Sequence, residues 1–330
     1  MLRFANLESN LEIHLDPELK AVVDAAAEAN PNPPDVTKLP IEMFRAGYVM
    51  VSQAQSLADI KCDSISDLEV PGAEGPIGAR LYVPEGAGDE TLPGLIFIHG
   101  GGFMIGDLDT HDSVCRQLAN GARCRVIALD YRLAPEHKFP AAVDDAIAAA
   151  THITRNAADY GMDASSLAVG GDSAGGNLSA IVSNHFASQG ANPFAMQLLI
   201  YPATDGTVET ESRRELQDGI TLDRKVLDYF FEGYLGGLDT DDNDPRLNPA
   251  KASSFEGAPR AHIVTAQYDP LSDEGKAYGD LLKAAGVEVS YRCYEGLMHN
   301  FILQTGVVTA AKNAVDDMAS ALADAFAHSR

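Results

Sequence analysis

One seven-residue stretch constrains the fold of this chain more than any other: Gly-Asp-Ser-Ala-Gly-Gly-Asn at residues 171–177. The apolar residues 166–170 precede it, and residues 178–187 have the composition of a helix. The pattern predicts a buried strand, a sharp turn with Ser173 at its apex, and a helix. The flanking glycines allow strand and helix to approach closely, and the helix start directs free N–H groups toward the serine. Ordinary glycine-rich turns share this pattern, so a nucleophile elbow needs support from the rest of the chain.

Composition excludes several classes of function. The chain has 330 residues, enough for one large core, and carries 24 basic and 48 acidic residues for a net charge of −24. We therefore expect no binding to nucleic acid and no stable membrane association, because both surfaces are polyanionic. The beginning of the chain is polar and no apolar run approaches 18 residues, so we expect a cytoplasmic protein. The four cysteines lack a disulfide or metal spacing and are expected to be reduced.

The order of predicted elements indicates an α/β fold. Residues 1–60 show helical periodicity before any strand and are expected to form an N-terminal helical cap segment. Residues 61–203 begin with a hairpin pattern and then alternate strands with helices, as the first part of a core. Residues 204–257 interrupt the alternation and are expected to contribute to the cap, and residues 258–330 complete the core. The alternation predicts a mostly parallel central sheet flanked by helices.

Two further residues with catalytic chemistry lie where strands are expected to end. Asp269 follows one apolar strand, and His299 follows the last one. Ser173, Asp269 and His299 occur in the order expected for a nucleophile elbow on such a sheet, and loops at the carboxyl ends of parallel strands face one crevice. Asp273 and Glu274 compete with Asp269 for the acid's role, but both fall inside the next expected helix.

A glycine run provides candidate anion donors. His-Gly-Gly-Gly-Phe at residues 99–103 follows directly on an apolar strand. Three consecutive glycines are costly in chain entropy, and they are explained if bare backbone N–H groups must approach a ligand. The N–H groups of Gly101 and Gly102, together with that of Ala174, are therefore candidates for an oxyanion hole.

Other polar residues are expected to have structural roles. Asp172 should point away from the pocket, and His99 should shape the glycine loop. No histidine pair has metal-ligand spacing with acidic partners, so no metal site is expected. The remaining histidines within the expected fold are assigned to the surface (His111, His137, His152) or to regular elements (His185, His262).

The motifs together resemble a known family. Residues 99–103, 130–136, 171–177, 268–271 and 299–301 resemble the hormone-sensitive-lipase-like (family IV) bacterial carboxylesterases of the α/β-hydrolase superfamily, over about residues 64–330. The resemblance implies an α/β-hydrolase fold with a helical cap, and a serine hydrolase acting on short- to medium-chain acyl esters through an acyl-enzyme. It also implies a small-molecule ester substrate and no cofactor. Members of the family often form dimers, so a homodimer is one expected assembly.

The motifs leave two questions open. A deacetylase, lactonase or amidase would use the same three residues, and a non-catalytic small-molecule binding module can share the fold. The retention of all three residues argues against the binding module.

Six apolar residues near the expected site loops or in the insertion are candidates for lining the substrate pocket: Phe103, Met104, Tyr229, Phe230, Leu297 and Met298.

Overall fold

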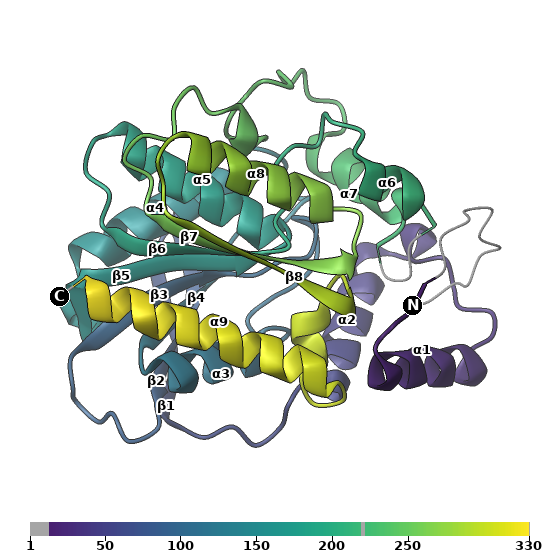
Figure 1. Ribbon diagram of the computed structural model, residues 1–330, viewed down its shortest axis with the longest axis horizontal. Helices are drawn as coiled ribbons and strands as arrows, with labels where there is room; N and C mark the ends of the chain where they lie inside the picture. The colour runs from purple at the N-terminus through teal and green to yellow at the C-terminus, as the bar shows by residue number, and fades with distance from the viewer. Residues whose placement is uncertain (1–12, 219–221, 330) are drawn as a thin grey trace.

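The computed structural model describes residues 13–218 and 222–329, which fold around one eight-stranded sheet (Figure 1). The strand order is β1-β2-β4-β3-β5-β6-β7-β8. The strands are β1 (Cys62–Pro71), β2 (Pro76–Pro84), β3 (Leu92–Ile98), β4 (Arg125–Asp130), β5 (Met162–Asp172), β6 (Phe194–Ile200), β7 (Arg260–Tyr268) and β8 (Val289–Met298). β2 pairs antiparallel with β1 and with β4, and all other pairs are parallel. The predicted hairpin at the sheet edge and the mostly parallel sheet are confirmed.

Helices cover both faces of the sheet. α3 (Asp112–Ala122) and α9 (Thr309–His328) pack on one face, and α4 (Ala141–Arg155), α5 (Ala174–Ser188) and α8 (Ser272–Ala284) lie on the other (Figure 1). A central parallel strand is therefore buried on both sides, which explains why the predicted strands are continuously apolar rather than alternating.

The side chains of β3 show how one strand serves two cores. Leu95 and Phe97 face the core that contains α3 and α9, whereas Ile96 and Ile98 face the core that contains α4 and α5. All four side chains are fully buried. Successive strand side chains point to opposite faces, so each residue in turn fills a different core.

The remaining helices lie beyond the carboxyl ends of the strands. They are α1 (Pro17–Ala29), α2 (Ile41–Gln55), α6 (Glu211–Glu215) and α7 (Arg224–Leu235) (Figure 1). α1 packs on the core, because its side chains Leu19 and Val23 are fully buried in the cluster that contains α3 and α9. An ion pair between Lys225 and Asp35 joins α7 to the segment between α1 and α2, which is far away in the sequence. Residues 1–12 and 219–221 of the two segments assigned to the cap lie outside the described residues. Short 3₁₀ turns complete the fold at Val36–Lys38, Ala157–Tyr160, Pro249–Lys251 and Phe301–Gln304.

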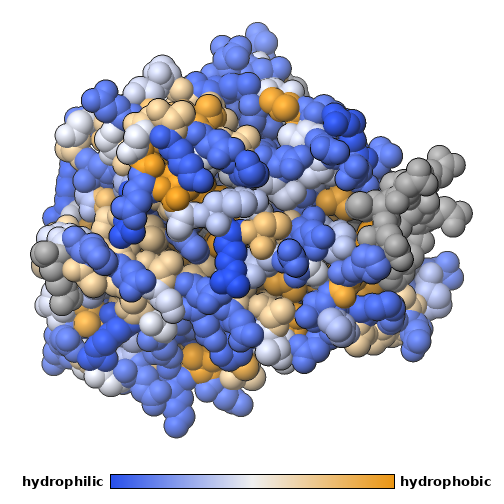
Figure 2. Space-filling model, viewed as in Figure 1, coloured by the Kyte–Doolittle hydropathy of each residue, from blue (hydrophilic) through white to orange (hydrophobic). Residues whose placement is uncertain are grey.

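Figure 2 shows a largely hydrophilic face, on which hydrophobic side chains gather in small separate patches. Within the described residues, none of the helices has the length and apolar character needed to span a membrane.

Candidate active site

Ser173 occupies a strained turn between β5 and α5. Its backbone has φ 54° and ψ −117°, a region that non-glycine residues rarely adopt and that is found mainly at functional sites. The glycines on either side permit this geometry. A Cβ on Gly171 would lie 2.7 Å from the carbonyl oxygen of Gly175 and closer still to that of Ile98, and a Cβ on Gly175 would also collide with Ile98. The sequence motif therefore folds into the predicted strand, sharp turn and helix.

The structure brings together the three residues predicted from motif order. His299 Nε2 lies 3.0 Å from Ser173 Oγ, and His299 Nδ1 lies 2.7 Å from Asp269 Oδ2. The second oxygen of Asp269 accepts the backbone N–H of Leu271 at 2.8 Å. Ser173 is 7% exposed, His299 3% and Asp269 0%, so the imidazole and carboxylate interact away from bulk water. The hydrogen-bond chain has the geometry that a serine nucleophile requires.

The two competing carboxylates have other partners. Glu274, in α8, accepts the backbone N–H of Thr204 at 2.7 Å and forms a buried ion pair with Arg213 of α6. Burial raises the pKa of Glu274 to about 7, although Arg213 acts in the opposite direction. Asp273 accepts the backbone N–H of Ser212 at 2.9 Å. Both side chains thus attach α6 to α8, and Asp269 is the carboxylate at His299 Nδ1.

The glycine loop after β3 presents free N–H groups. Gly101 and Gly102 have φ values of 119° and 59°, which favour glycine. Throughout residues 13–218 and 222–329, no acceptor is found for the N–H groups of Gly101, Gly102 or Ala174. Ala174 is the first residue of α5, where the positive end of the helix dipole adds to the attraction for an anion.

Four of the six candidate pocket residues lie where α7 meets the glycine loop. Phe103 stacks on Tyr234 of α7 with ring centroids 4.0 Å apart. A Cβ on Gly233 would collide with Met104, so α7 rests directly on that side chain. The rings of Tyr229 and Phe230 lie 6.4 and 6.0 Å from Phe44 of α2.

Phe230 also covers the glycine loop, since a Cβ on Gly102 would lie within 2.6 Å of its ring atoms. Leu297 and Met298, the last residues of β8, are buried in the core with α3 and α9. The pocket role of all six residues stays a prediction.

One assignment was wrong. His111 was expected on the surface, but the structure buries it completely, with Nε2 at 3.0 Å from the equally buried Asp172. The signal for burial lies in the helix that follows. His111, Val114, Cys115 and Leu118 recur at helical spacing, and all four face the interior. An apolar stripe that begins with a histidine predicts that the histidine is buried too.

Asp172 is fully buried, and its Oδ1 accepts the N–H of Gly100 in the glycine loop at 2.8 Å. His99 donates from Nδ1 to the carbonyl oxygen of Gly100 at 2.8 Å, which agrees with its expected role in shaping the loop. Tyr201 was missed. Its ring packs against that of His299 with centroids 4.6 Å apart, and its residue type alone carries no signal for this contact.

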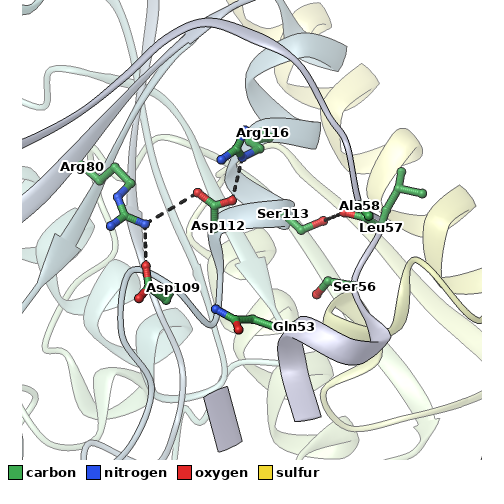
Figure 3. A pocket seen from close by; sticks show the side chains of 9 residues that line it. All are labelled: Gln53, Ser56, Leu57, Ala58, Arg80, Asp109, Asp112, Ser113 and Arg116. Atoms are coloured by element: carbon green, nitrogen blue, oxygen red, sulfur yellow. Dashed lines mark hydrogen bonds and ion pairs between the residues drawn. The ribbon is translucent and has the colours of Figure 1, made fainter. Parts of the chain in front are cut away.

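Two cavities lie outside this constellation. The first, about 260 Å³, is formed between the end of α2 and the start of α3 (Figure 3). Figure 3 shows that its charges are paired internally: Arg80 faces Asp109 and Asp112, and Arg116 bonds Asp112 at 2.6 Å. The second, about 240 Å³, lies between α7 and Pro270, next to the Asp269 loop. Within the described part of the chain, no three His, Cys, Asp or Glu side chains form a group that could hold a metal ion.

Comparisons with known proteins agree with this geometry. A model of the family described as the alpha/beta hydrolase fold matches residues 95–303. Esterase LipI of Mycobacterium tuberculosis is 41% identical over 253 residues, which cover 76% of this chain and 79% of that protein. Carboxylic ester hydrolase LipN of the same organism is 43% identical over 263 residues, covering 78% and 69%.

A solved structure is similar along nearly the whole chain. The ester hydrolase EH1AB1 from the metagenome of Lake Arreo, determined in complex with a derivative of bipyridine phosphonate, has a TM-score of 0.91 and 42% identity. The match covers 95% of this chain and 100% of that one. This chain therefore belongs to the α/β-hydrolase fold family, in the hormone-sensitive-lipase-like group whose motifs its sequence carries.

Proposed function

We propose that this protein is a serine carboxylesterase that hydrolyses short- to medium-chain acyl esters of small molecules through Ser173, His299 and Asp269. The observation that carries the proposal is the continuous hydrogen-bond chain from Ser173 Oγ through His299 to Asp269, with distances of 3.0 and 2.7 Å. The printed names of the relatives, an esterase and a carboxylic ester hydrolase, support the same reaction.

Acylation follows from these contacts. His299 Nε2 removes the Ser173 proton as Oγ attacks the ester carbonyl carbon, while Asp269 holds the proton on Nδ1 and stabilises the imidazolium. The carbonyl π bond opens to an oxyanion. When the oxyanion collapses, the bond to the alkoxy oxygen breaks, and the alcohol leaves with the proton from Nε2.

The free N–H groups of Gly101, Gly102 and Ala174 suit the charge that develops in this step. Donors aimed at an oxyanion stabilise it more than the neutral carbonyl, and losing one costs about 3–4 kcal/mol. Deacylation repeats the sequence with water. His299 removes a proton from water, the hydroxide oxygen attacks the acyl carbon, and the carboxylic acid leaves as Ser173 regains its proton.

The test is hydrolysis of p-nitrophenyl esters across a series of acyl chains from acetyl to palmitoyl. We expect activity that peaks at the short chains and is lost in Ser173→Ala. Ser183→Ala is the matched control, because Ser183 is a fully buried serine of α5, the helix that follows Ser173. Hydrolysis that survives in Ser173→Ala would contradict the assignment of the nucleophile. A folded wild-type protein inactive on every ester would favour an amidase or a binding module.

A further inference from the structure

The first two residues of the glycine loop, His99 and Gly100, are held by hydrogen bonds from their backbone atoms to side chains. Tyr131 donates its hydroxyl to the carbonyl oxygen of His99 at 2.9 Å. The N–H of Gly100 donates to Asp172 Oδ1 at 2.8 Å, and the carbonyl oxygen of Gly100 accepts from His99 Nδ1 at 2.8 Å. Burial lowers the pKa of His99 to about 4, so a neutral ring makes this bond at neutral pH. The next two residues of the loop carry the free N–H groups.

Asp172 provides the charged anchor of this loop. Its side chain is fully buried, one residue before the nucleophile, and a Cβ on Gly100 would lie 2.7 Å from its carbonyl oxygen and closer to its carboxylate. The loop can therefore rest on Asp172 only because residue 100 is a glycine. Oδ2 of Asp172 lies 3.5 Å from the hydroxyl of Tyr201, whose ring packs on His299. The Asp172 carboxylate therefore contacts both the loop that carries the oxyanion donors and the tyrosine that packs on the imidazole of His299.

A buried carboxylate at this position has an electrostatic cost. Its negative charge opposes the oxyanion that must form nearby, and in a dry site that repulsion is poorly screened. His111 offers the compensating charge. Its Nε2 lies 3.0 Å from Asp172 Oδ1, but the angle is poor for a hydrogen bond. The contact is therefore mainly an electrostatic one between the two side chains.

The other ring nitrogen of His111 contacts Thr110. The hydroxyl of Thr110 lies 2.7 Å from the carbonyl oxygen of Asp107 and 2.8 Å from His111 Nδ1. With its single proton on the carbonyl, Thr110 accepts a hydrogen bond from Nδ1–H. Burial raises the pKa of Asp172, but His111, the N–H of Gly100 and His99 together lower the pKa below its usual value.

We propose that Asp172 and His111 are positioning residues. The Asp172 carboxylate, with its charge balanced by His111, fixes the glycine loop so that the N–H groups of Gly101 and Gly102 point at the developing oxyanion. The effect of the pair on catalysis rests on the function proposed above. The effect of the pair on the conformation of the glycine loop is independent of that function.

Four variants separate the hydrogen bond from the charge. Asp172→Ala removes both the acceptor and the charge, whereas Asp172→Asn keeps an oxygen that can accept from Gly100. His111→Ala leaves the Asp172 charge without its counter-ion, and the double variant His111→Ala/Asp172→Asn removes that charge again. Asp145→Asn is the matched control, because Asp145 is also fully buried and paired with an arginine, Arg132, at 2.8 Å.

The first measurement is kcat and KM on p-nitrophenyl acetate, with melting temperatures alongside. We expect kcat to fall about 100-fold in Asp172→Ala and about tenfold in Asp172→Asn, with KM within about twofold, because oxyanion donors act in the transition state. We also expect the double variant to be more active than His111→Ala, because the two residues are coupled. A general loss of stability would not produce that recovery.

The second measurement is amide hydrogen exchange of residues 99–106 by mass spectrometry. We expect faster exchange there in Asp172→Ala and unchanged exchange in Asp145→Asn. Wild-type kcat in folded Asp172→Ala, or a loss equal to that in Asp145→Asn, would overturn the proposal. If the wild-type protein hydrolyses no ester, the esterase function fails, and exchange decides the positioning alone: unchanged loop exchange in Asp172→Ala would refute it.

Discussion

Adding one methyl group to the glycine loop should separate α7 from the oxyanion donors. In Gly102→Ala, the new Cβ would lie within 2.6 Å of the Phe230 ring, about 1 Å short of ordinary carbon–carbon contact. Residue 102 also has φ 59°, where an alanine costs roughly 1–2 kcal/mol. A displacement of about 1 Å at a reacting centre can cost roughly 100-fold in rate. We therefore expect kcat on p-nitrophenyl acetate to fall about 100-fold in Gly102→Ala.

The second half of this experiment removes the obstacle. Gly102→Ala/Phe230→Ala relieves the collision and leaves only the backbone strain, so its kcat should recover to within about tenfold of the Phe230→Ala single variant, the strain being worth roughly 1–2 kcal/mol. The assay is steady-state hydrolysis by all four proteins at equal folded concentration. Wild-type kcat in Gly102→Ala, or no recovery in the double variant, would refute the packing of Phe230 on this loop.

Three further changes have defined outcomes. Asp269→Asn should lower kcat about 10⁴-fold, because the amide favours the wrong imidazole tautomer. The kcat of Asp273→Asn should stay near that of the wild type. Equal losses of kcat in the two variants would reject Asp269 as the carboxylate that orients His299. Burial lowers the pKa of His262 to about 4, so the unfolded chain gains a proton first as pH falls; stability should fall from about pH 6.5 toward pH 4, and urea denaturation of His262→Asn should show a shallower loss. In thermal melts, Gly175→Ala should destabilise the protein strongly, since its Cβ would overlap a carbonyl oxygen of β3. Gly47→Ala, on the open face of α2, should stabilise it by about 0.5–1 kcal/mol. Equal shifts in melting temperature would contradict the packing described for the turn at Ser173.

Local patterns were sufficient for the parts of the fold that depend on local physics. The turn at Ser173 follows from the residues on either side of it, because the close approach of β5 and α5 leaves room only for glycine. The site residues could be predicted because parallel strands deliver their carboxyl ends to one edge of the sheet. Asp269 and His299 each follow the end of such a strand, so their order in the sequence was enough to indicate that they meet.

Long-range pairing could not be predicted in the same way. The alternating pattern of the sequence over residues 287–291 predicts a strand there, but β8 runs from Val289 to Met298. The later part of the strand is irregular, since Gly296 has φ 73° and the pairing with β7 shifts register between Ala266 and Tyr268. The partner of His111 could not be predicted either, although the helical periodicity that follows it indicates burial. A histidine is stable in the interior only with a partner, and that partner, Asp172, comes from a distant strand that periodicity near His111 does not reveal.

The central claim is that Ser173 is a nucleophile activated by His299, and covalent labelling tests it most directly. Diethyl p-nitrophenyl phosphate should release close to one equivalent of p-nitrophenolate per chain, and peptide mapping should place the diethylphosphoryl group on Ser173. His299→Ala should react far more slowly, and Ser173→Ala should take up no label at that peptide. Label on another residue, or ester hydrolysis that continues after Ser173 is fully labelled, would contradict the account.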